Sequence, residues 1–227
     1  MKINRQYALW AVLVLGLLSL TAAALWWGPD RRLGGGAARG GVEGGSASGA
    51  PAQLDDFGAV PGFTLVSQTG ATVQRTDLDG QVWIADFIFT SCHGTCPLMS
   101  AQMQRVNDML AREREVKLVS FSVDPERDTP QRLAEYGAEF GAKPERWLFL
   151  TGDKPQLRAL TIEGFHLPAT DTPPADVAQG QEIVTHSTRF VLVDRNGRIR
   201  GYYSGIDAKA VDQLVEDTRR LLAARES

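Results

Sequence analysis

The stretch VWIADFIFTSCHGTCP, residues 82–97, places an apolar run directly before the only two cysteines of the chain. A short and almost continuous apolar run is typical of a strand that is buried on both faces, and we predict one over Val82–Phe89. Asp86 interrupts this run. Its carboxyl group could be buried with a shifted pKa, turned towards a polar groove or paired locally, and the sequence leaves it unassigned.

A helix is predicted directly after the cysteines. Pro97 suits the first position of a helix, where its missing N–H group is not needed, so Cys96 is expected to be the N-cap. At that place unpaired N–H groups and the positive end of the helix dipole favour a thiolate, and the pKa of the Cys96 thiol should fall. Four apolar residues then recur at helical spacing and predict a core face: Met99, Met103, Val106 and Leu110.

The rest of the folded part alternates strands with helices. Helix starts are indicated by Thr129-Pro130 and Asp207, and a hairpin turn is indicated by Asn196-Gly197. Glu163–Thr185 shows no periodicity and holds three prolines, so we expect a long loop there. The expected strands are Phe63–Val66, Ala71–Val73, Val82–Phe89, Val116–Val123, Trp147–Leu150, Arg189–Val193 and Ile199–Tyr203, with helices after Pro97, Thr129 and Asp207 and a short one at Lys154–Ile162.

This order of elements predicts an α/β fold. Strands that alternate with helices imply a parallel sheet, and the late hairpin adds antiparallel strands. We therefore predict a three-layer sandwich around a mixed sheet. The cysteine loop follows a central strand, and open α/β sheets hold their functional sites at the carboxyl ends of their strands.

The N-terminal part is predicted to lie outside this domain. Tyr7–Trp27 carries no charge and is long enough to cross a bilayer core of roughly 30 Å, so we expect a transmembrane anchor. The alternative is a cleaved signal peptide, with Ala22-Ala23-Ala24 as the cleavage site. The expected organisation is a cytoplasmic N-terminus at 1–6, the anchor at 7–27, a flexible Gly/Ala-rich tether at 28–53 and the folded domain at 54–227. Both interpretations export the domain.

The charge of the chain argues against a nucleic-acid partner. The 24 Lys and Arg residues and 27 Asp and Glu residues give a net charge of -3, and they are interleaved along the sequence. Binding to nucleic acid requires a clustered basic face, which this pattern does not provide. We predict no nucleic-acid partner.

Three uses of Cys92 and Cys96 remain open on the residues alone. They could form a structural disulfide, exchange disulfides as an oxidoreductase, or bind a soft metal ion such as Cu(I). A disulfide across so short a loop would constrain the unfolded chain little. A metal site would need a third ligand.

The third ligand could come from any of the three histidines, His93, His166 and His186. His186 lies just before the strand Arg189–Val193. If that strand runs antiparallel to Val82–Phe89, His186 would face the cysteine loop. The thioethers of Met99 and Met103 could also bind Cu(I), but their helical spacing favours a place in the core.

Three motifs in this order resemble the SCO/SenC family of copper-binding, thioredoxin-like proteins. They are FIFTSCHGTCP at 87–97, VSFSVDPERDTP at 119–130, and THST at 185–188 followed by FVLVD at 190–194. Their order and spacing fit the family from about Asp56 to Leu222, which is nearly all of the folded part.

The resemblance implies a thioredoxin-like domain that binds copper, as Cu(I), Cu(II) or both, through Cys92, Cys96 and His186. It also implies a disulfide between the two cysteines when they are oxidised. Family members assist assembly of the dinuclear copper site of cytochrome c oxidase subunit II, so the expected partners are that subunit or another exported copper protein, and other copper chaperones. The expected location is the bacterial inner membrane, with a single-pass anchor and the domain in the periplasm.

The alternative function is a thiol–disulfide oxidoreductase that reduces cysteines of that subunit or of another exported protein. Thioredoxin-like oxidoreductases have two residues between their cysteines and a cis-proline before the facing strand. Here three residues separate the cysteines, and His186-Ser187 stands in the place of the proline. Both departures favour metal binding. The resemblance assigns no role to His93 or Asp124.

Overall fold

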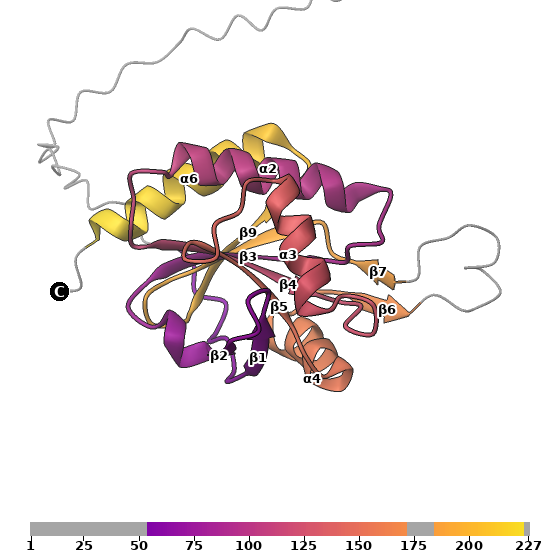
Figure 1. Ribbon diagram of the computed structural model, residues 1–227. Helices are drawn as coiled ribbons and strands as arrows, with labels where there is room; N and C mark the ends of the chain where they lie inside the picture. Colours follow the sequence, from indigo (N-terminus) through magenta and orange to yellow (C-terminus); the bar gives the residue numbers. More distant parts are fainter. Residues whose placement is uncertain (1–53, 172–183, 225–227) are drawn as a thin grey trace, which may run out of the picture. The chain divides into compact units, whose positions relative to one another are not determined.

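The computed structural model describes residues 54–171 and 184–224, and within them the side chains of all residues except 170, 171 and 184–186. A seven-stranded sheet forms the middle layer, with helices on both sides (Figure 1). The elements are β1 (Thr64–Ser67), β2 (Thr72–Gln74), η1 (Arg75–Leu78), β3 (Val82–Ile88), α2 (Thr95–Met109), β4 (Val116–Ser122), α3 (Pro130–Glu139), β5 (Trp147–Thr151), α4 (Lys154–Ala159), η2 (Leu160–Gly164), β6 (Ala169–Asp171), β7 (Val184–His186), β8 (Arg189–Val193), β9 (Ile199–Ser204) and α6 (Ala208–Ala223).

The sheet is mixed, as the sequence predicts. Its strand order is β2-β1-β5-β4-β3-β8-β9. The central strands β3, β4 and β5 are parallel, whereas β1, β2, β8 and β9 pair antiparallel with their neighbours. β6 and β7 form a separate antiparallel pair. The α/β sandwich is confirmed, and the strand that precedes the cysteines occupies a central position.

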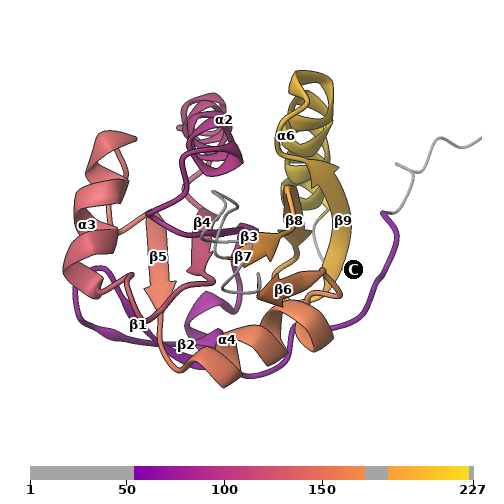
Figure 2. The ribbon, with the colours of Figure 1, turned by 90° about the vertical axis from the view of Figure 1, so that its right-hand side faces the viewer.

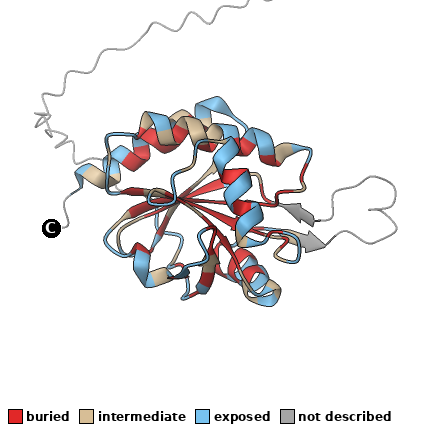
Figure 3. Ribbon diagram, viewed as in Figure 1, coloured by how far each residue is buried: buried red, intermediate tan, exposed pale blue. Residues whose placement is uncertain are grey.

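The strand β3 is buried on both faces, which explains its continuous apolar sequence. Its side chains alternate between two cores. Val82, Ile84 and Ile88 pack with α2, α3 and α6, whereas Trp83, Ala85 and Phe87 pack on the opposite face, where α4 lies. Figure 2 shows the three layers, and Figure 3 shows that the buried positions concentrate in the sheet and on the inner faces of the helices.

The helix α2 begins earlier than the sequence predicts. Gly94 is the N-cap, so Cys96 is the second residue of the helix and Pro97 the third. The prediction of Cys96 as N-cap is therefore wrong. The physical reason is that every position of the first turn lacks an intrahelical N–H partner, so proline fits the third position without loss of a hydrogen bond. Cys96 still lies within the first turn.

The predicted loop at Glu163–Thr185 is wrong in part. Its ends contain the last residues of η2 and the short strands β6 and β7, while residues 172–183 lie outside the described part. Strands of three residues are too short to show an alternating pattern, so the sequence gives no sign of them. The helix predicted at Lys154–Ile162 is α4, continued by the π-helical turn η2.

The predicted caps and the predicted turn are confirmed. The Thr129 hydroxyl accepts a hydrogen bond from the Arg132 N–H at 3.2 Å, and Asp207 caps α6 in the same way. Gly197 has a φ of +73°, which suits the tight turn between β8 and β9. These local signals set the starts of α3 and α6 and the turn between β8 and β9.

Within residues 54–171 and 184–224, no helix combines the length and the apolar character needed to cross a membrane. The anchor expected at 7–27 and the tether expected at 28–53 lie outside the described residues.

Candidate metal centre

The two thiols meet where β3 passes into α2. The backbone N–H of Cys96 donates a hydrogen bond to Cys92 Sγ, with 3.4 Å between nitrogen and sulfur. Both cysteines are buried. The first turn of α2 therefore directs a donor, and the positive end of its dipole, at the sulfur of Cys92.

The segment that carries His186 reaches the same end of the sheet. β8 runs antiparallel to β3, with Ala85 opposite Val191, so the start of β8 lies at the carboxyl end of β3. β7 ends at His186, three residues before β8 begins. The antiparallel pairing is confirmed, and Figure 1 shows β6 and β7 at the end of the sheet where the chain enters α2.

The described side chains contain no group of three or more His, Cys, Asp or Glu that could hold a metal ion. The side chain of His186 is not among them, so its place in a three-ligand site stays a prediction. His93 and His166 are both exposed. Met99 and Met103 are buried in the core beneath α2, which confirms their structural role.

A buried carboxylate fixes the loop that leads to Cys92. Asp128 accepts hydrogen bonds from the Thr90 hydroxyl and from the Ser122 hydroxyl, both at 2.6 Å. The backbone N–H of Thr90 also donates to it, at 3.2 and 3.3 Å to the two oxygens. Burial raises the pKa of Asp128, and these donors oppose that shift. Asp128 thus links the end of β4, through Ser122, to Thr90, which follows β3 and lies two residues before Cys92.

A second carboxylate, Asp124, lies in the same connection and is also buried. Arg127 Nη1 donates to both of its oxygens, at 3.1 and 3.0 Å. This pairing raises the pKa of Arg127. The ion pair closes the turn between β4 and α3, whose N-cap is Thr129.

Asp86 is fully buried under α2 in the middle of β3. Neither of its carboxylate oxygens has hydrogen-bonding geometry to a described group, although Ser120 on β4 lies close enough to offset part of the effect of burial. Burial raises the pKa of Asp86 to about 7. Burial of the phenol is the largest cause of the raised pKa of Tyr136. The charges of Cys96, Asp86 and Cys92 raise it further, so these three groups lie within electrostatic range of Tyr136.

Sequence reasoning missed the network of Asp128, Thr90 and Ser122. All three residues lie inside the quoted motifs, but hydrogen bonds between residues 38 positions apart leave no periodic signal. The one local sign in the sequence was that Asp128 directly precedes Thr129 and Pro130, the N-cap and the first residue of α3. Sequence reasoning also missed the hydrogen bond between the hydroxyls of Tyr136 on α3 and Ser100 on α2, with 2.8 Å between the two oxygens, for the same reason.

Comparison with known proteins agrees with this arrangement. The family model described as SCO1/SenC matches residues 52–223. The SCO1 protein homolog of Bacillus subtilis is 34% identical over 159 residues, which cover 69% of this chain and 79% of that protein.

Two solved structures share the fold. BsSco, described as a member of the Sco family of cytochrome c oxidase assembly proteins with a disulfide switch, is 32% identical with a TM-score of 0.66, and the match covers 76% of this chain and 99% of that one. ScoI of Bradyrhizobium japonicum, solved with copper bound, is 25% identical with a TM-score of 0.61, and the match covers 72% and 99%. From the motifs, the fold and these matches, the chain belongs to the SCO1/SenC family.

Proposed function

We propose that this protein is a copper metallochaperone that binds Cu(I) or Cu(II) through Cys92, Cys96 and His186. Its acceptor is the dinuclear copper site of cytochrome c oxidase subunit II, or another exported copper protein. Residues 7–27 anchor it in the bacterial inner membrane as a single span, with the domain at 54–227 in the periplasm.

The observation that carries this proposal is the pair of neighbouring, buried cysteines at the start of α2. Cys92 and Cys96 lie on one short loop, with the Cys96 N–H 3.4 Å from Cys92 Sγ. Thiolates are soft ligands that select Cu(I) over the harder cations. The Cys96 N–H, in the first turn of α2, is directed at the Cys92 sulfur and holds it at the start of the helix.

His186 is the proposed third ligand. The antiparallel pairing of β8 with β3 brings the backbone of β7 to the end of the sheet where the cysteines lie. Imidazole suits copper as well as thiolate does. A site of only three ligands leaves room for an incoming ligand from the acceptor, so copper could move by stepwise exchange without release into solvent.

A Cu(I) titration against a competing chelator tests this function. The reduced protein should bind one Cu(I), and Cys92→Ala should lose that binding while it keeps its fold, measured by circular dichroism. Wild-type protein oxidised to the Cys92–Cys96 disulfide is the matched control, because it has the same sequence without thiolate ligands. Stoichiometric high-affinity binding in Cys92→Ala would contradict the proposal.

A second candidate function is the reduction of disulfides in the acceptor. Its support is that the two cysteines lie next to each other on one short loop, and that the relative BsSco is described with a disulfide switch. In this reaction Cys92 and Cys96 would form a disulfide and give two electrons and two protons to the acceptor disulfide, which becomes a dithiol. His186→Ala separates the two functions, since it should lower copper affinity and leave the reductase activity.

A further inference from the structure

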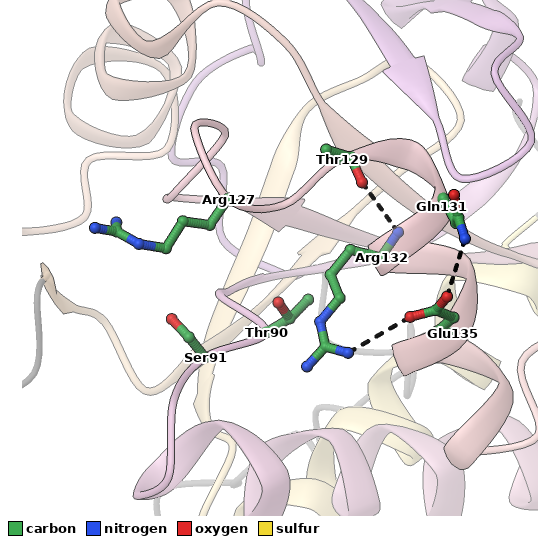
Figure 4. A pocket seen from close by; sticks show the side chains of 7 residues that line it. All are labelled: Thr90, Ser91, Arg127, Thr129, Gln131, Arg132 and Glu135. Carbon is green, nitrogen blue, oxygen red and sulfur yellow. Dashed lines mark hydrogen bonds and ion pairs between the residues drawn. The ribbon is translucent and has the colours of Figure 1, made fainter.

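A polar pocket of about 440 Å³ lies beside the cysteine loop. Its walls come from the end of β3, the connection after β4 and the first turns of α3 (Figure 4). Its lining residues are Thr90, Ser91, Arg127, Thr129, Gln131, Arg132 and Glu135. Ser91 directly precedes Cys92, so the pocket borders the candidate metal centre.

Two guanidinium groups line this pocket, and each retains donors for a further carboxylate. Arg132 is 53% exposed, and among the described residues its guanidinium pairs only with Glu135, at 3.5 Å. Arg127 is 52% exposed and uses Nη1 alone for its bonds to Asp124. A guanidinium has five N–H donors, so the remaining edges of both side chains can bind an anionic group.

The hydroxyl of Ser91 points to a ligand independently of the arginines. Its oxygen is shielded from solvent, and it has no hydrogen-bond partner among the described residues. Buried polar atoms are rarely left without a partner. Figure 4 shows Thr90 between Ser91 and the Arg132 side chain, and since the Thr90 hydroxyl already bonds Asp128, the Ser91 hydroxyl is the available donor on this wall of the pocket.

Directly after the two cysteines, the chain exposes apolar side chains. Leu98, in the first turn of α2, is 49% exposed, and it is one of four large apolar side chains that are exposed in the described part of the chain. Pro97 beside it is exposed as well. Arginine and exposed apolar side chains together are typical of protein interfaces, and this combined surface is wider than a small ion requires.

We propose that this surface docks the protein that receives copper, and that Arg132 binds an Asp or Glu side chain beside the acceptor's own copper ligands. Arg127 and the Ser91 hydroxyl assist at the same pocket, while Leu98 makes the apolar contact. The inference rests on the proposed function and adds to it the chemistry of the partner. Docking at this place would bring the acceptor ligands next to Cys92.

Charge reversal of Arg132 tests the docking surface. The probe is the copper-free soluble domain of a cytochrome c oxidase subunit II, mixed with the copper-loaded full chain over a series of salt concentrations. For the Arg132→Glu variant we expect transfer to be at least about tenfold slower at low salt, because steering between charged surfaces sets association rates. The matched control is Arg112→Glu, which makes the same charge change at an exposed position remote from the carboxyl ends of the strands.

Restoration of the rate provides the stricter test. An Asp or Glu near the acceptor's copper ligands, changed to Lys, should recover transfer from Arg132→Glu and should slow transfer from the wild type. Equal rates for Arg132→Glu and Arg112→Glu would overturn the docking proposal. The docking proposal would also be overturned if the wild type did not associate with the subunit II domain. The copper-binding function is tested separately, by the Cu(I) affinity of the same samples.

Discussion

Asp86 and Asp128 are both fully buried, but they lie in different surroundings. Asp128, in the connection between β4 and α3, receives hydrogen bonds from two hydroxyls and one backbone N–H. Asp86, in the middle of β3, has no such donor among the described groups. Burial raises the pKa of both carboxyl groups and nearby donors oppose the shift at each, but within the described part of the chain only Asp128 has donors in hydrogen-bonding geometry.

This difference gives the two aspartates different roles, one in the middle of β3 and one in the connection after β4. A buried carboxylate with a full set of donors holds its neighbours in place, so Asp128 orders the chain before Cys92. Burial makes the charged form of a carboxyl group costly when its donors are poorly placed, so Asp86 makes the stability of the core depend on pH. The following changes test this contrast, from the largest expected effect to the smallest.

Asp86→Asn should remove most of the pH dependence of stability between pH 4 and pH 7. The pKa of Asp86 rises from 3.8 to about 7 on folding, so the folded state binds an extra proton in this window and loses stability as the pH rises through it. Above pH 7 this shift lowers the free energy of unfolding by about 4 kcal/mol relative to its value below pH 4. Guanidinium unfolding of the reduced, metal-free protein from pH 4 to pH 8 measures it.

The control for this variant is Asp55→Asn, which changes an exposed aspartate outside the sheet. It should leave the pH dependence of the free energy of unfolding unchanged. A smaller slope of the same sign should remain in Asp86→Asn, because burial also raises the pKa of Asp128. A slope in Asp86→Asn equal to that of the wild type would show that Asp86 does not titrate in this window.

Asp128→Asn should lower the free energy of unfolding by about 2 to 3 kcal/mol. An amide cannot accept from both hydroxyls and the Thr90 N–H, because its NH₂ group is itself a donor. Denaturant unfolding at pH 7 measures the loss. The reduction potential of the Cys92–Cys96 pair should also change, since Thr90 lies two residues before Cys92.

A double-mutant cycle with Thr90→Val isolates the bond between Asp128 and Thr90. We expect a coupling energy of about 1 kcal/mol or more, because the two side chains bond directly at 2.6 Å. If the effects of Asp128→Asn and Thr90→Val simply add, Asp128 does not hold the loop through Thr90.

Thr129→Ala should have the smallest effect, about 1 kcal/mol of stability. It removes one neutral acceptor, the hydroxyl that caps α3 through the Arg132 N–H at 3.2 Å. Thr129→Ser keeps the acceptor and should restore most of the loss in thermal unfolding. A loss as large as that of Asp128→Asn would mean that charge is not what distinguishes Asp128.

Much of the fold could be predicted because its signals are local. The apolar run at Val82–Phe89 exists because β3 is buried on both faces, and the cap at Thr129 and the turn at Gly197 are set by neighbouring residues. β6 and β7 could not be predicted, since three residues in each strand carry no pattern. The start of α2 was misplaced because proline is tolerated at several positions of a first turn.

The site was predictable only as a set of residue types. The sequence shows that Cys92 and Cys96 are close, and the antiparallel pairing of β8 agrees with the predicted approach of the His186 segment. The partners of Asp128 and the burial of Asp86 depend on contacts between distant segments, which one sequence does not reveal.

The Cu(I) affinity of His186→Ala tests the central claim most directly. It should be compared with the wild type and with His93→Ala and His166→Ala, which remove the two exposed histidines, by competition with a Cu(I) chelator. We expect His186→Ala alone to bind Cu(I) more weakly, by at least about tenfold, or about 1.4 kcal/mol. If His186→Ala bound Cu(I) as tightly as the wild type, the proposed site of two cysteines and one histidine would be contradicted.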